Sequence, residues 1–274
     1  MNAASAGYAD LGNGRLYYGM RGEGETVVLS HAGFVDSRMW DDQWDAFAAR
    51  YRAIRFDMRG FGKSDPAAEP VCRREDLRRL LENLGVERAA FVGCSLSDEV
   101  VIDYALEHPE RVWALVVVSA APGGFEMQGE MPPELMELFA AMQQGDLARA
   151  SELQNRIWID GPFRQPEQVS APVRRRAAEM NRIALESQTM RIADAHPACP
   201  LDPPAAQRLS EIDAPTLLIA GALDNAEIVR AAEFMRAAIP NAEKIVMPDC
   251  AHLPNMEQPE AFNRHVLEFL DRRA

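Results

Sequence analysis

The sequence has no long hydrophobic run. None of its stretches approaches the roughly 20 consecutive apolar residues that a membrane-spanning helix requires. The first residues, MNAASAG, show neither the basic start nor the apolar middle of a secretory signal, so a cytoplasmic location is expected. Cysteine is scarce, with four widely spaced residues and no CxxC pair. This pattern favours reduced thiols over a disulfide framework or a zinc site.

Positive charge is scarce as well. The chain has 29 Lys and Arg against 42 Asp and Glu, a formal net charge of -13. This excess repels nucleic acid phosphates and anionic membrane surfaces, so neither nucleic acid nor a membrane is expected as a partner. The 47% hydrophobic and 26% charged residues are ordinary for a globular protein. A length of 274 residues allows one large core or a core with an insertion, and leaves a homodimer open.

Short apolar runs alternate with stretches of helical spacing along most of the chain. The pair Asn13-Gly14 predicts an opening antiparallel hairpin. The later runs predict strands buried on both faces of a parallel sheet, joined by right-handed helical crossovers. The fold class is therefore α/β, a mostly parallel eight-stranded sheet flanked by helices. The predicted strands are 26–30, 53–56, 89–93, 112–119, 216–221 and 244–247, and the predicted helices are 39–49, 73–84, 96–107, 226–239 and 259–272.

The alternation stops at residue 123 and resumes near residue 211. The segment between shows helical spacing without a strand signal, and a structureless loop of that length is implausible in a compact domain. We therefore expect an inserted helical cap over 123–210, on a core formed by 1–122 and 211–274. Gly123-Gly124 and the stretch 201–204 are the predicted hinges.

The segment 91–97, FVGCSLS, places a serine between an apolar strand and a predicted helix. A sharp strand-to-helix turn would expose the hydroxyl of Ser95, and it requires small residues two positions before and after because the backbone passes close by. Gly93 meets this requirement fully, and Ser97 meets it less well than glycine would. The pattern is typical of a nucleophile elbow, with a simple helix N-cap as the structural alternative.

A serine hydroxyl needs a base and an oriented acid to act as a nucleophile. His252 follows the last predicted strand and is the candidate base, and Asp224 follows the strand before it and is the candidate acid. The order Ser95, Asp224, His252 is the one expected after a nucleophile elbow. The carboxyl ends of parallel strands gather at one edge of a sheet, so the three side chains are expected to converge there. Each residue taken alone also has a structural alternative: Asp224 as a cap of the following helix, and His252 as an ordinary loop histidine.

Backbone N–H groups are the expected stabilisers of the oxyanion in acyl transfer, each worth roughly 3 to 4 kcal/mol when removed. Leu96, at the start of the predicted helix, supplies one expected donor. The second is expected from the turn after strand 26–30, with Gly33 preferred and Phe34 as the near alternative. His31 in the same turn is interpreted as holding the loop through backbone hydrogen bonds rather than transferring protons.

With these motifs assembled, the chain resembles the α/β-hydrolase superfamily along nearly its whole length. Within this superfamily it looks like capped, cofactor-free members such as 3-oxoadipate enol-lactonase and the small carboxylesterases. The resemblance implies the α/β-hydrolase fold, the triad and no cofactor. It says little about the substrate, because proteins with this fold catalyse many different reactions. It is strongest in the segments 30–33, 36–40, 57–64, 93–97, 221–224 and 251–254.

The chain departs from this resemblance at Ser97-Asp98, where the family usually has two glycines. A carboxylate in the first helical turn gains about 0.3 to 1 kcal/mol from the helix dipole. At about 7 Å from the oxyanion, with an effective dielectric near 20, it would cost roughly 2 kcal/mol. We therefore expect Asp98 to turn away from the pocket, to pair with a cation, or to bind a positively charged part of the substrate.

The predicted cap is rich in methionine and aromatic residues, most of them expected in its core and some beneath it, where they would line the substrate cleft. Its arginines at 156, 164 and 191 are candidates to meet a substrate carboxylate, although surface placement is expected for each. The candidate substrate-binding residues are Phe34, Asp98, Phe125 and Trp158.

The sequence as a whole predicts a serine hydrolase that cleaves a small or medium carboxylic ester or lactone through an acyl-enzyme. Two alternatives stay open: a carbon–carbon bond hydrolase or lyase on the same triad, and a slow-turnover ligand receptor. No cofactor is predicted. No metal site is predicted either, because His196 and Cys199 lack further ligands.

Overall fold

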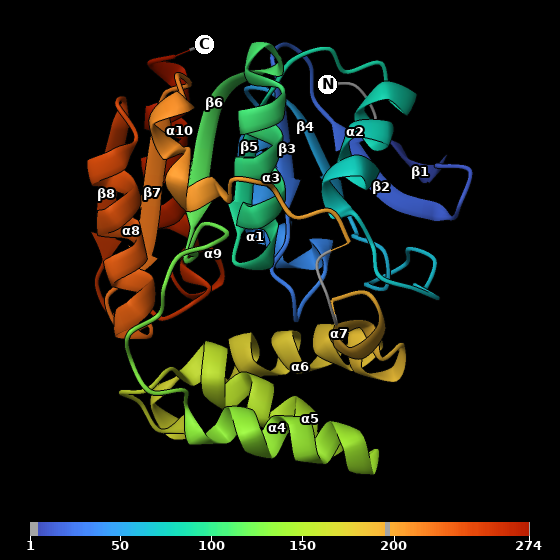
Figure 1. Cartoon of the computed structure of the whole chain (residues 1–274), viewed down its shortest axis with the longest axis vertical. Coiled ribbons are helices and arrows are strands. Elements are labelled where there is room, and N and C mark those ends of the chain that lie inside the picture. The colour runs from blue at the N-terminus through green and yellow to red at the C-terminus, as the bar shows by residue number, and fades with distance from the viewer. Residues whose placement is uncertain (1–4, 195–197, 274) are drawn as a thin grey trace.

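The chain folds around one mostly parallel β-sheet (Figure 1). The computed structural model describes residues 5–194 and 198–273, and of residues 98 and 99 it describes the backbone alone. In this part of the chain the sheet has the order β1-β2-β4-β3-β5-β6-β7-β8. β2 pairs antiparallel with β1 and β4, and the other pairs are parallel. The strands are β1 (Ser5–Asp10), β2 (Arg15–Arg21), β3 (Thr26–Ser30), β4 (Arg52–Phe56), β5 (Ala89–Cys94), β6 (Val112–Val118), β7 (Thr216–Gly221) and β8 (Ala242–Met247).

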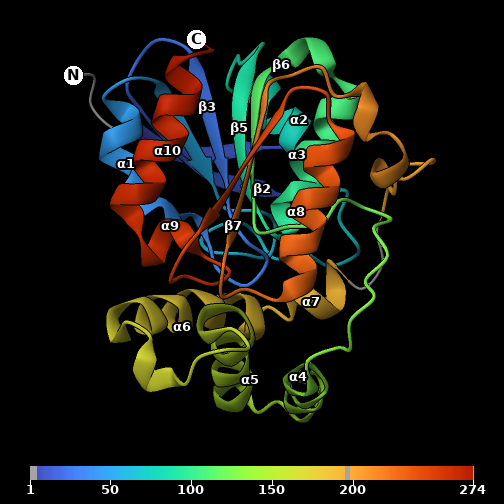
Figure 2. The same cartoon turned by 90° about the vertical axis from the view of Figure 1, so that its left-hand side faces the viewer.

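Helices cover both faces of the sheet (Figure 2): α1 (Asp41–Ala48) and α10 (Pro259–Asp271) on one face, and α2 (Arg73–Asn83), α3 (Leu96–Glu107) and α8 (Ala226–Ala238) on the other. Alternate residues of β5 serve the two layers. Val92 packs in the cluster that contains Phe47 and Phe262, whereas Phe91 packs in the cluster that contains Tyr104. A strand covered on both faces has to be apolar throughout, which explains its unbroken hydrophobic run.

The α/β fold and its predicted elements are confirmed. The parallel strands and the helices of the sheet unit begin and end within two residues of their predicted positions. Two details of the prediction are wrong. β8 is half exposed rather than buried on both faces, because it is the last strand of the sheet. The hairpin turn centres on Gly12-Asn13, since Leu11 N–H donates to Gly14 O at 3.0 Å.

Between β6 and β7 the chain leaves the sheet and forms helices that lie together at one end of it (Figure 1). We call residues 123–210 the cap, and their exact division from the core stays a prediction. In its described residues the cap has no strand. Leu138, Leu153 and Leu185 share a small separate core there. The cap helices are α4 (Pro133–Gln144), α5 (Leu147–Gln154), the π-helical turn η3 (Asn155–Asp160), α6 (Ala171–Glu186) and α7 (Thr189–Ile192).

The two segments that join the cap to the sheet unit lie side by side. Ala206 N–H donates to Gly123 O at 2.9 Å. A Cβ on Gly124, which has a φ of 82°, would lie 2.7 Å from Pro204. Only glycine fits this close approach at that backbone angle. No helix in the described part of the chain combines the length and hydrophobicity of a membrane span.

The expectation of four reduced cysteines is wrong for one pair. Cys72, directly before α2, forms a disulfide with Cys199 of the cap, and their Cα atoms are 5.5 Å apart. The two residues are 127 positions apart, so their spacing gave no sign of pairing. His196, the other candidate metal ligand, lies outside the described residues. Disulfides are typical of oxidising compartments, so the cytoplasmic location stays a prediction.

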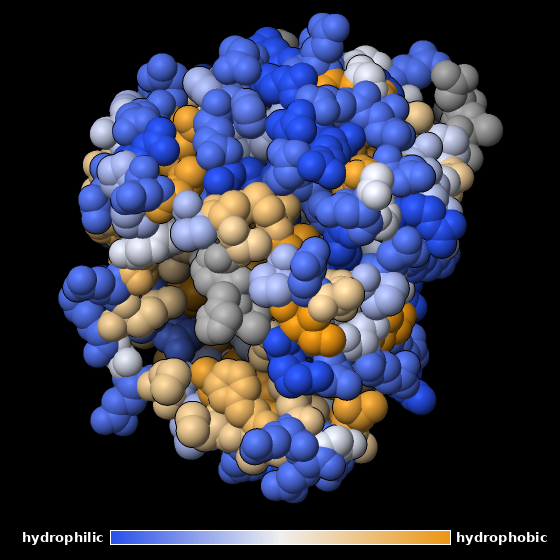
Figure 3. Space-filling view, turned by 45° about the vertical axis from the view of Figure 1, so that its right-hand side comes forward, coloured by the Kyte–Doolittle hydropathy of each residue, from blue (hydrophilic) through white to orange (hydrophobic). Residues whose placement is uncertain are grey.

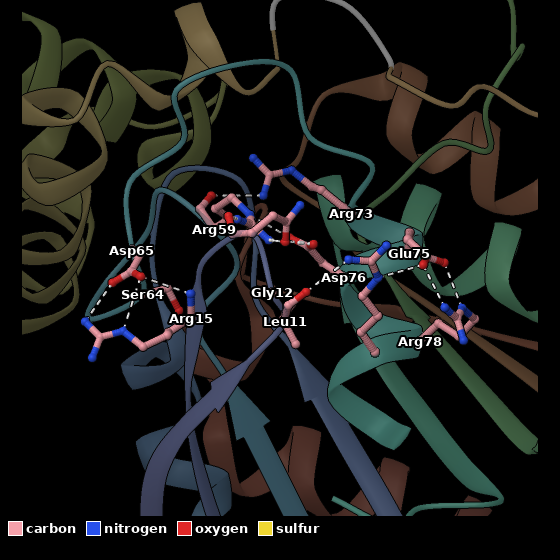
Figure 4. Close-up of polar contacts among 12 residues, drawn as sticks. Leu11, Gly12, Arg15, Arg59, Ser64, Asp65, Arg73, Glu75, Asp76 and Arg78 are labelled. Carbon is pink, nitrogen blue, oxygen red and sulfur yellow. Dashed lines mark hydrogen bonds and ion pairs between the residues drawn. The ribbon is translucent and has the colours of Figure 1, made fainter. Parts of the chain in front are cut away.

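The loop after β4 is held by buried ionic contacts. Asp57 accepts the N–H groups of Ser37 and Lys63, each at 2.8 Å. Arg59 donates to both carboxylate oxygens of Asp76 on α2, at 2.8 and 2.9 Å (Figure 4). A bidentate pair of this kind fixes both side chains in position. This loop therefore serves the structure and joins β4 to α2.

Candidate active site

Ser95 lies in the turn between β5 and α3. Its φ of 57° and ψ of -119° fall in a region that side chains rarely adopt, and such strain is characteristic of a nucleophile elbow. Ser95 is partly exposed, whereas Cys94 before it is fully buried. The side chain of Ser95 makes no capping hydrogen bond to α3, so the N-cap alternative finds no support.

His252 and Asp224 form a buried hydrogen-bonded pair in the loops after β8 and β7. Nδ1 of His252 lies 2.8 Å from Oδ2 of Asp224, and both side chains are less than 5% exposed. A carboxylate oxygen is an acceptor, so Nδ1 carries the proton and Nε2 carries a lone pair. Nε2 makes no hydrogen bond to any residue that the structure describes. The imidazole is therefore arranged to accept a proton at Nε2.

The elbow packs against the loop after β8 that carries His252, which we call the histidine loop. Sγ of Cys94, the residue before Ser95, lies 3.9 Å from the carbonyl oxygen of His252. The ring of Phe34 lies 6.4 Å from the imidazole, centroid to centroid. The loops after β3, β5, β7 and β8 thus meet at one edge of the sheet, as the topology of parallel strands requires.

The two predicted oxyanion donors are neighbours. A Cβ built on Gly33 would lie 2.9 Å from Cβ of Leu96, so the turn after β3 touches the start of α3. Any larger residue at position 33 would separate the two segments. Gly33 and Leu96 therefore lie beside each other, and their role as the oxyanion hole stays a prediction.

Ser97 stands where the family pattern has a glycine, and its hydroxyl hydrogen-bonds to two residues of the neighbouring segment. Its side chain is fully buried. Ser30 O–H donates to Ser97 Oγ at 2.8 Å, and Ser97 O–H donates to the carbonyl oxygen of His31. This chain of hydrogen bonds joins the turn after β3 to the first turn of α3. It holds together the two segments that carry Gly33 and Leu96.

Replacing Ser97 with alanine is expected to lower kcat by roughly 10- to 100-fold, because a small displacement of the oxyanion donors is enough for such a loss. The free energy of unfolding should fall by about 1 to 3 kcal/mol, since Ser30 and His31 lose buried partners. Steady-state kinetics and urea denaturation measure both effects. The matched control is Ser151→Ala, which removes a hydroxyl hydrogen bond to Asn181 within the cap. An equal fall of kcat in both variants would contradict the expected role of Ser97.

His31 is a structural residue, as the sequence predicted. Nδ1 donates to Ala32 O at 2.9 Å, and Nε2 accepts the N–H of Met58 at 2.9 Å. Burial lowers the pKa of His31 below its ordinary value of 6.5, against the opposing charge of Asp57. The ring is therefore neutral and joins the loops after β3 and β4.

The cap is fastened to the histidine loop. His252 N–H donates to Trp158 O at 3.3 Å. Arg164 donates to Glu257 at 2.6 Å, and Glu257 accepts the N–H of Ala251 at 2.7 Å. Burial raises the pKa of Glu257 above its ordinary value of 4.5, which Arg164 opposes. The expected surface placement is wrong for Arg164, whose side chain is 10% exposed, because the cap folds back onto this loop.

Replacing Arg164 with methionine is expected to lower the free energy of unfolding by about 3 to 5 kcal/mol, because Glu257 stays buried without its partner. Chemical denaturation measures the loss. The double variant Arg164→Met, Glu257→Gln removes the unpaired charge and should recover part of the stability. If the two side chains acted independently, Glu257→Gln would lower the free energy of unfolding of the Arg164→Met variant further, by as much as it does on its own. Such additive losses would contradict this coupling.

A cavity of about 380 Å³ opens beside His252, between the sheet unit and the cap. Trp158 lines it, and its role in binding substrate stays a prediction. Phe34 is buried and stacks on Trp158, with centroids 4.9 Å apart, so it supports the wall. We call this space the histidine cavity. It is lined by Met127, Gly129, Glu130, Met131, Pro132, Glu134, Leu135, Arg156, Ile157, Trp158, Gly161, Pro162, Asp224, Asn225, Glu227, Ile228 and His252.

One candidate substrate-binding residue, Phe125, is not among the described residues that line this cavity. Phe125 packs against Phe234, with centroids 5.4 Å apart, and lies under the guanidinium of Arg230. It lies there because the chain runs along α8 before it reaches α4, the first helix of the cap. The side chain of Asp98 lies outside the described residues, so its place stays a prediction.

A second cavity, of about 250 Å³, lies on the other side of the elbow, and Leu96 lines it. Its cations are paired. Arg73 donates to Asp194 at 2.6 and 2.9 Å and to Arg59 O at 3.2 Å. Arg74 donates to Asp103 at 3.1 Å and also to Glu107. Among the described residues, no group of three or more His, Cys, Asp or Glu side chains is placed to hold a metal ion.

Comparison with known proteins identifies the relatives of this chain. The family profile for the alpha/beta hydrolase fold matches residues 25–259. The chain is 31% identical to the 2-hydroxy-6-oxononadienedioate/2-hydroxy-6-oxononatrienedioate hydrolase of Paraburkholderia phymatum, over 98% of this chain and 96% of that protein. It is 27% identical to the 2-hydroxy-6-oxo-6-phenylhexa-2,4-dienoate hydrolase of Burkholderia cepacia, over 95% and 92%. The enol-lactonase of Burkholderia xenovorans has the same fold, with a TM-score of 0.78 at 23% identity over 97% and 100%.

These relatives correct the substrate predicted from the sequence. The prediction of an ester or lactone hydrolase is wrong, since the full-length relatives carry names of enzymes that hydrolyse 2-hydroxy-6-oxodienoates. The cause is chemical, because one triad serves both reactions and the motifs around it are shared. The alternative of a carbon–carbon bond hydrolase is the one that the relatives favour.

Proposed function

Because the chain belongs to the α/β-hydrolase fold family, we propose that it hydrolyses the carbon–carbon bond next to the ketone of a 2-hydroxy-6-oxodienoate. The observation that carries this proposal is the agreement among relatives that align with nearly the whole chain. Their names, from several organisms, describe hydrolases of two kinds of such substrates, dioates and a phenyl ketone.

The reaction adds one water across the bond between C5 and C6. C6 keeps its ketone oxygen, gains an oxygen from water and leaves as a carboxylic acid. C5 gains a proton and leaves as part of a 2-hydroxydienoate. A carbanion at C5 is a poor leaving group, so the 2-hydroxydiene first shifts its proton to C5 and becomes a 2-oxo compound. The electrons of the broken bond then pass into that ketone.

The residues of the site match these steps. Ser95 attacks C6 while Nε2 of His252 accepts its proton, and Asp224 stabilises the imidazolium that forms. The N–H groups of Gly33 and Leu96 bind the oxyanion on C6. Water then releases the acid from the acyl-enzyme, with His252 again as the base. The support for these roles is the pairing of His252 with Asp224 and the strained turn at Ser95.

The test is to incubate the purified protein with 2-hydroxy-6-oxo-6-phenylhexa-2,4-dienoate and to follow its absorbance. We expect benzoate and 2-hydroxypenta-2,4-dienoate in equal amounts, with one oxygen from labelled water in the benzoate. A panel of chromogenic esters is the control. Absence of both products, with rapid turnover of an ester, would overturn the proposal.

A further inference from the structure

We propose that this chain prefers substrates whose C6 substituent is uncharged and apolar, such as an aryl or alkyl ketone, over the dicarboxylate that some relatives are named for. The inference rests on the proposed function and narrows its substrate class. It depends on the charges that line the histidine cavity, which His252 lines, and the second cavity, which Leu96 lines.

The histidine cavity is acidic. Among the described residues that line it, four are carboxylates, Glu130, Glu134, Asp224 and Glu227, and one is an arginine, Arg156. Asp224 is committed to His252. Glu227 pairs with Arg230 at 2.6 Å, which holds the pKa of Glu227 near 2. Glu130 and Glu134 remain as carboxylates at the mouth and wall of the cavity.

The charge of Arg156 is already neutralised by a buried carboxylate. Nη1 of Arg156 lies 3.0 Å from Oδ2 of Asp160, a fully buried carboxylate. Asp160 also pairs with Arg174 at 2.8 Å, so both of its oxygens are in use. The charge of Arg156 is therefore balanced without a substrate anion. If Arg156 moved toward such an anion, Asp160 would lose one of its two partners. A carboxylate in this cavity would therefore meet net negative charge.

The apolar part of the lining suits an uncharged group. Trp158, Ile157 and Leu135 form the wall, with Met127 and Met131 at its edge. On the face shown in Figure 3, hydrophobic side chains gather in the lower half of the molecule, around the cap, while the upper half is largely hydrophilic. Aromatic and aliphatic side chains of this kind bind rings and alkyl chains.

The same charges orient the substrate. Every member of the class carries a carboxylate at C1, whereas the C6 substituent varies. The second cavity has two guanidinium groups, Arg73 and Arg74, balanced by the carboxylates of Asp103 and Asp194, so it repels an anion less than the histidine cavity does. The C1 carboxylate therefore lies toward the second cavity, and the C6 substituent lies in the histidine cavity.

The test compares 2-hydroxy-6-oxo-6-phenylhexa-2,4-dienoate with 2-hydroxy-6-oxonona-2,4-dienedioate. The two compounds share atoms C1 to C6 and differ in the C6 substituent alone. Any effect of the C1 carboxylate is therefore the same for both and cancels from the ratio of their kcat/KM values. We expect kcat/KM for the phenyl compound to be about 100-fold higher, the effect of one unfavourable charge contact at low effective dielectric. Equal values, or a preference for the dioate, would overturn this inference and leave the proposed function standing. Turnover of neither compound would overturn both.

The variant Glu134→Gln tests whether the charge of the histidine cavity causes the substrate preference. This change removes one negative charge from the lining without altering size, and we expect the ratio of the two kcat/KM values to move toward the dioate by about fivefold. Glu268→Gln is the matched control, because Glu268 is exposed on α10 and lines neither cavity. A ratio that stays unchanged in Glu134→Gln, or that moves equally in the control, would overturn the inference.

Discussion

Replacing Ser95 with alanine is expected to lower kcat by about 10⁶-fold, the loss seen when the nucleophile of a serine triad is removed. Alanine lacks the hydroxyl that attacks C6, and the binding groups and oxyanion donors that remain supply only a small residual rate. The backbone at position 95 has a φ of 57°. Alanine and serine are similarly restricted there, so the fold should be retained.

Steady-state kinetics with the phenyl dienoate measures this loss, and circular dichroism checks the fold. Ser210→Ala is the control, since Ser210 is exposed and lies outside both cavities. A Ser95→Ala enzyme that retains more than a small fraction of the wild-type kcat would show that water attacks directly with His252 as its base. The acyl-enzyme would then be excluded.

The sheet could be predicted because its strands are buried on both faces. Such strands are apolar throughout, and runs like 216–221 therefore mark β7 without help from distant residues. The turn at Ser95 was predictable for a similar local reason, since a nucleophile elbow requires a small residue two positions before the serine, and Gly93 stands there. The pairing of His252 with Asp224 was inferred from chain order, and the observed 2.8 Å contact agrees with it.

The features that were missed depend on contacts between distant segments. Arg164 and Glu257 are 93 residues apart, and neither lies in a motif, so the way the cap folds back was invisible in the sequence. The disulfide was missed for the same reason. The substrate was missed for a chemical reason, because a triad activates a hydroxyl in the same way for an ester and for a ketone. Substrate choice lies in the cavity lining, which the cap and α8 assemble together.

Replacing Asp224 with asparagine is expected to lower kcat by about 10⁴-fold and to leave KM nearly unchanged. The two oxygens of Asp224 have separate tasks: Oδ1 accepts the N–H of Asn225 at 2.7 Å, and Oδ2 accepts Nδ1–H of His252. Asparagine has one acceptor oxygen and one amide group. If its oxygen keeps the N–H of Asn225, its NH₂ group faces Nδ1.

That arrangement reverses the tautomer of His252. Nδ1 must then accept a hydrogen bond, the proton moves to Nε2, and the ring no longer accepts the proton of Ser95. Kinetics at several substrate concentrations separates kcat from KM, and Asp213→Asn, at an exposed position, is the matched control. A fall in kcat of less than tenfold would mean that Asp224 holds only the loop. The proton chemistry would then need another partner for His252, and among the described residues its Nδ1 bonds to Asp224 alone.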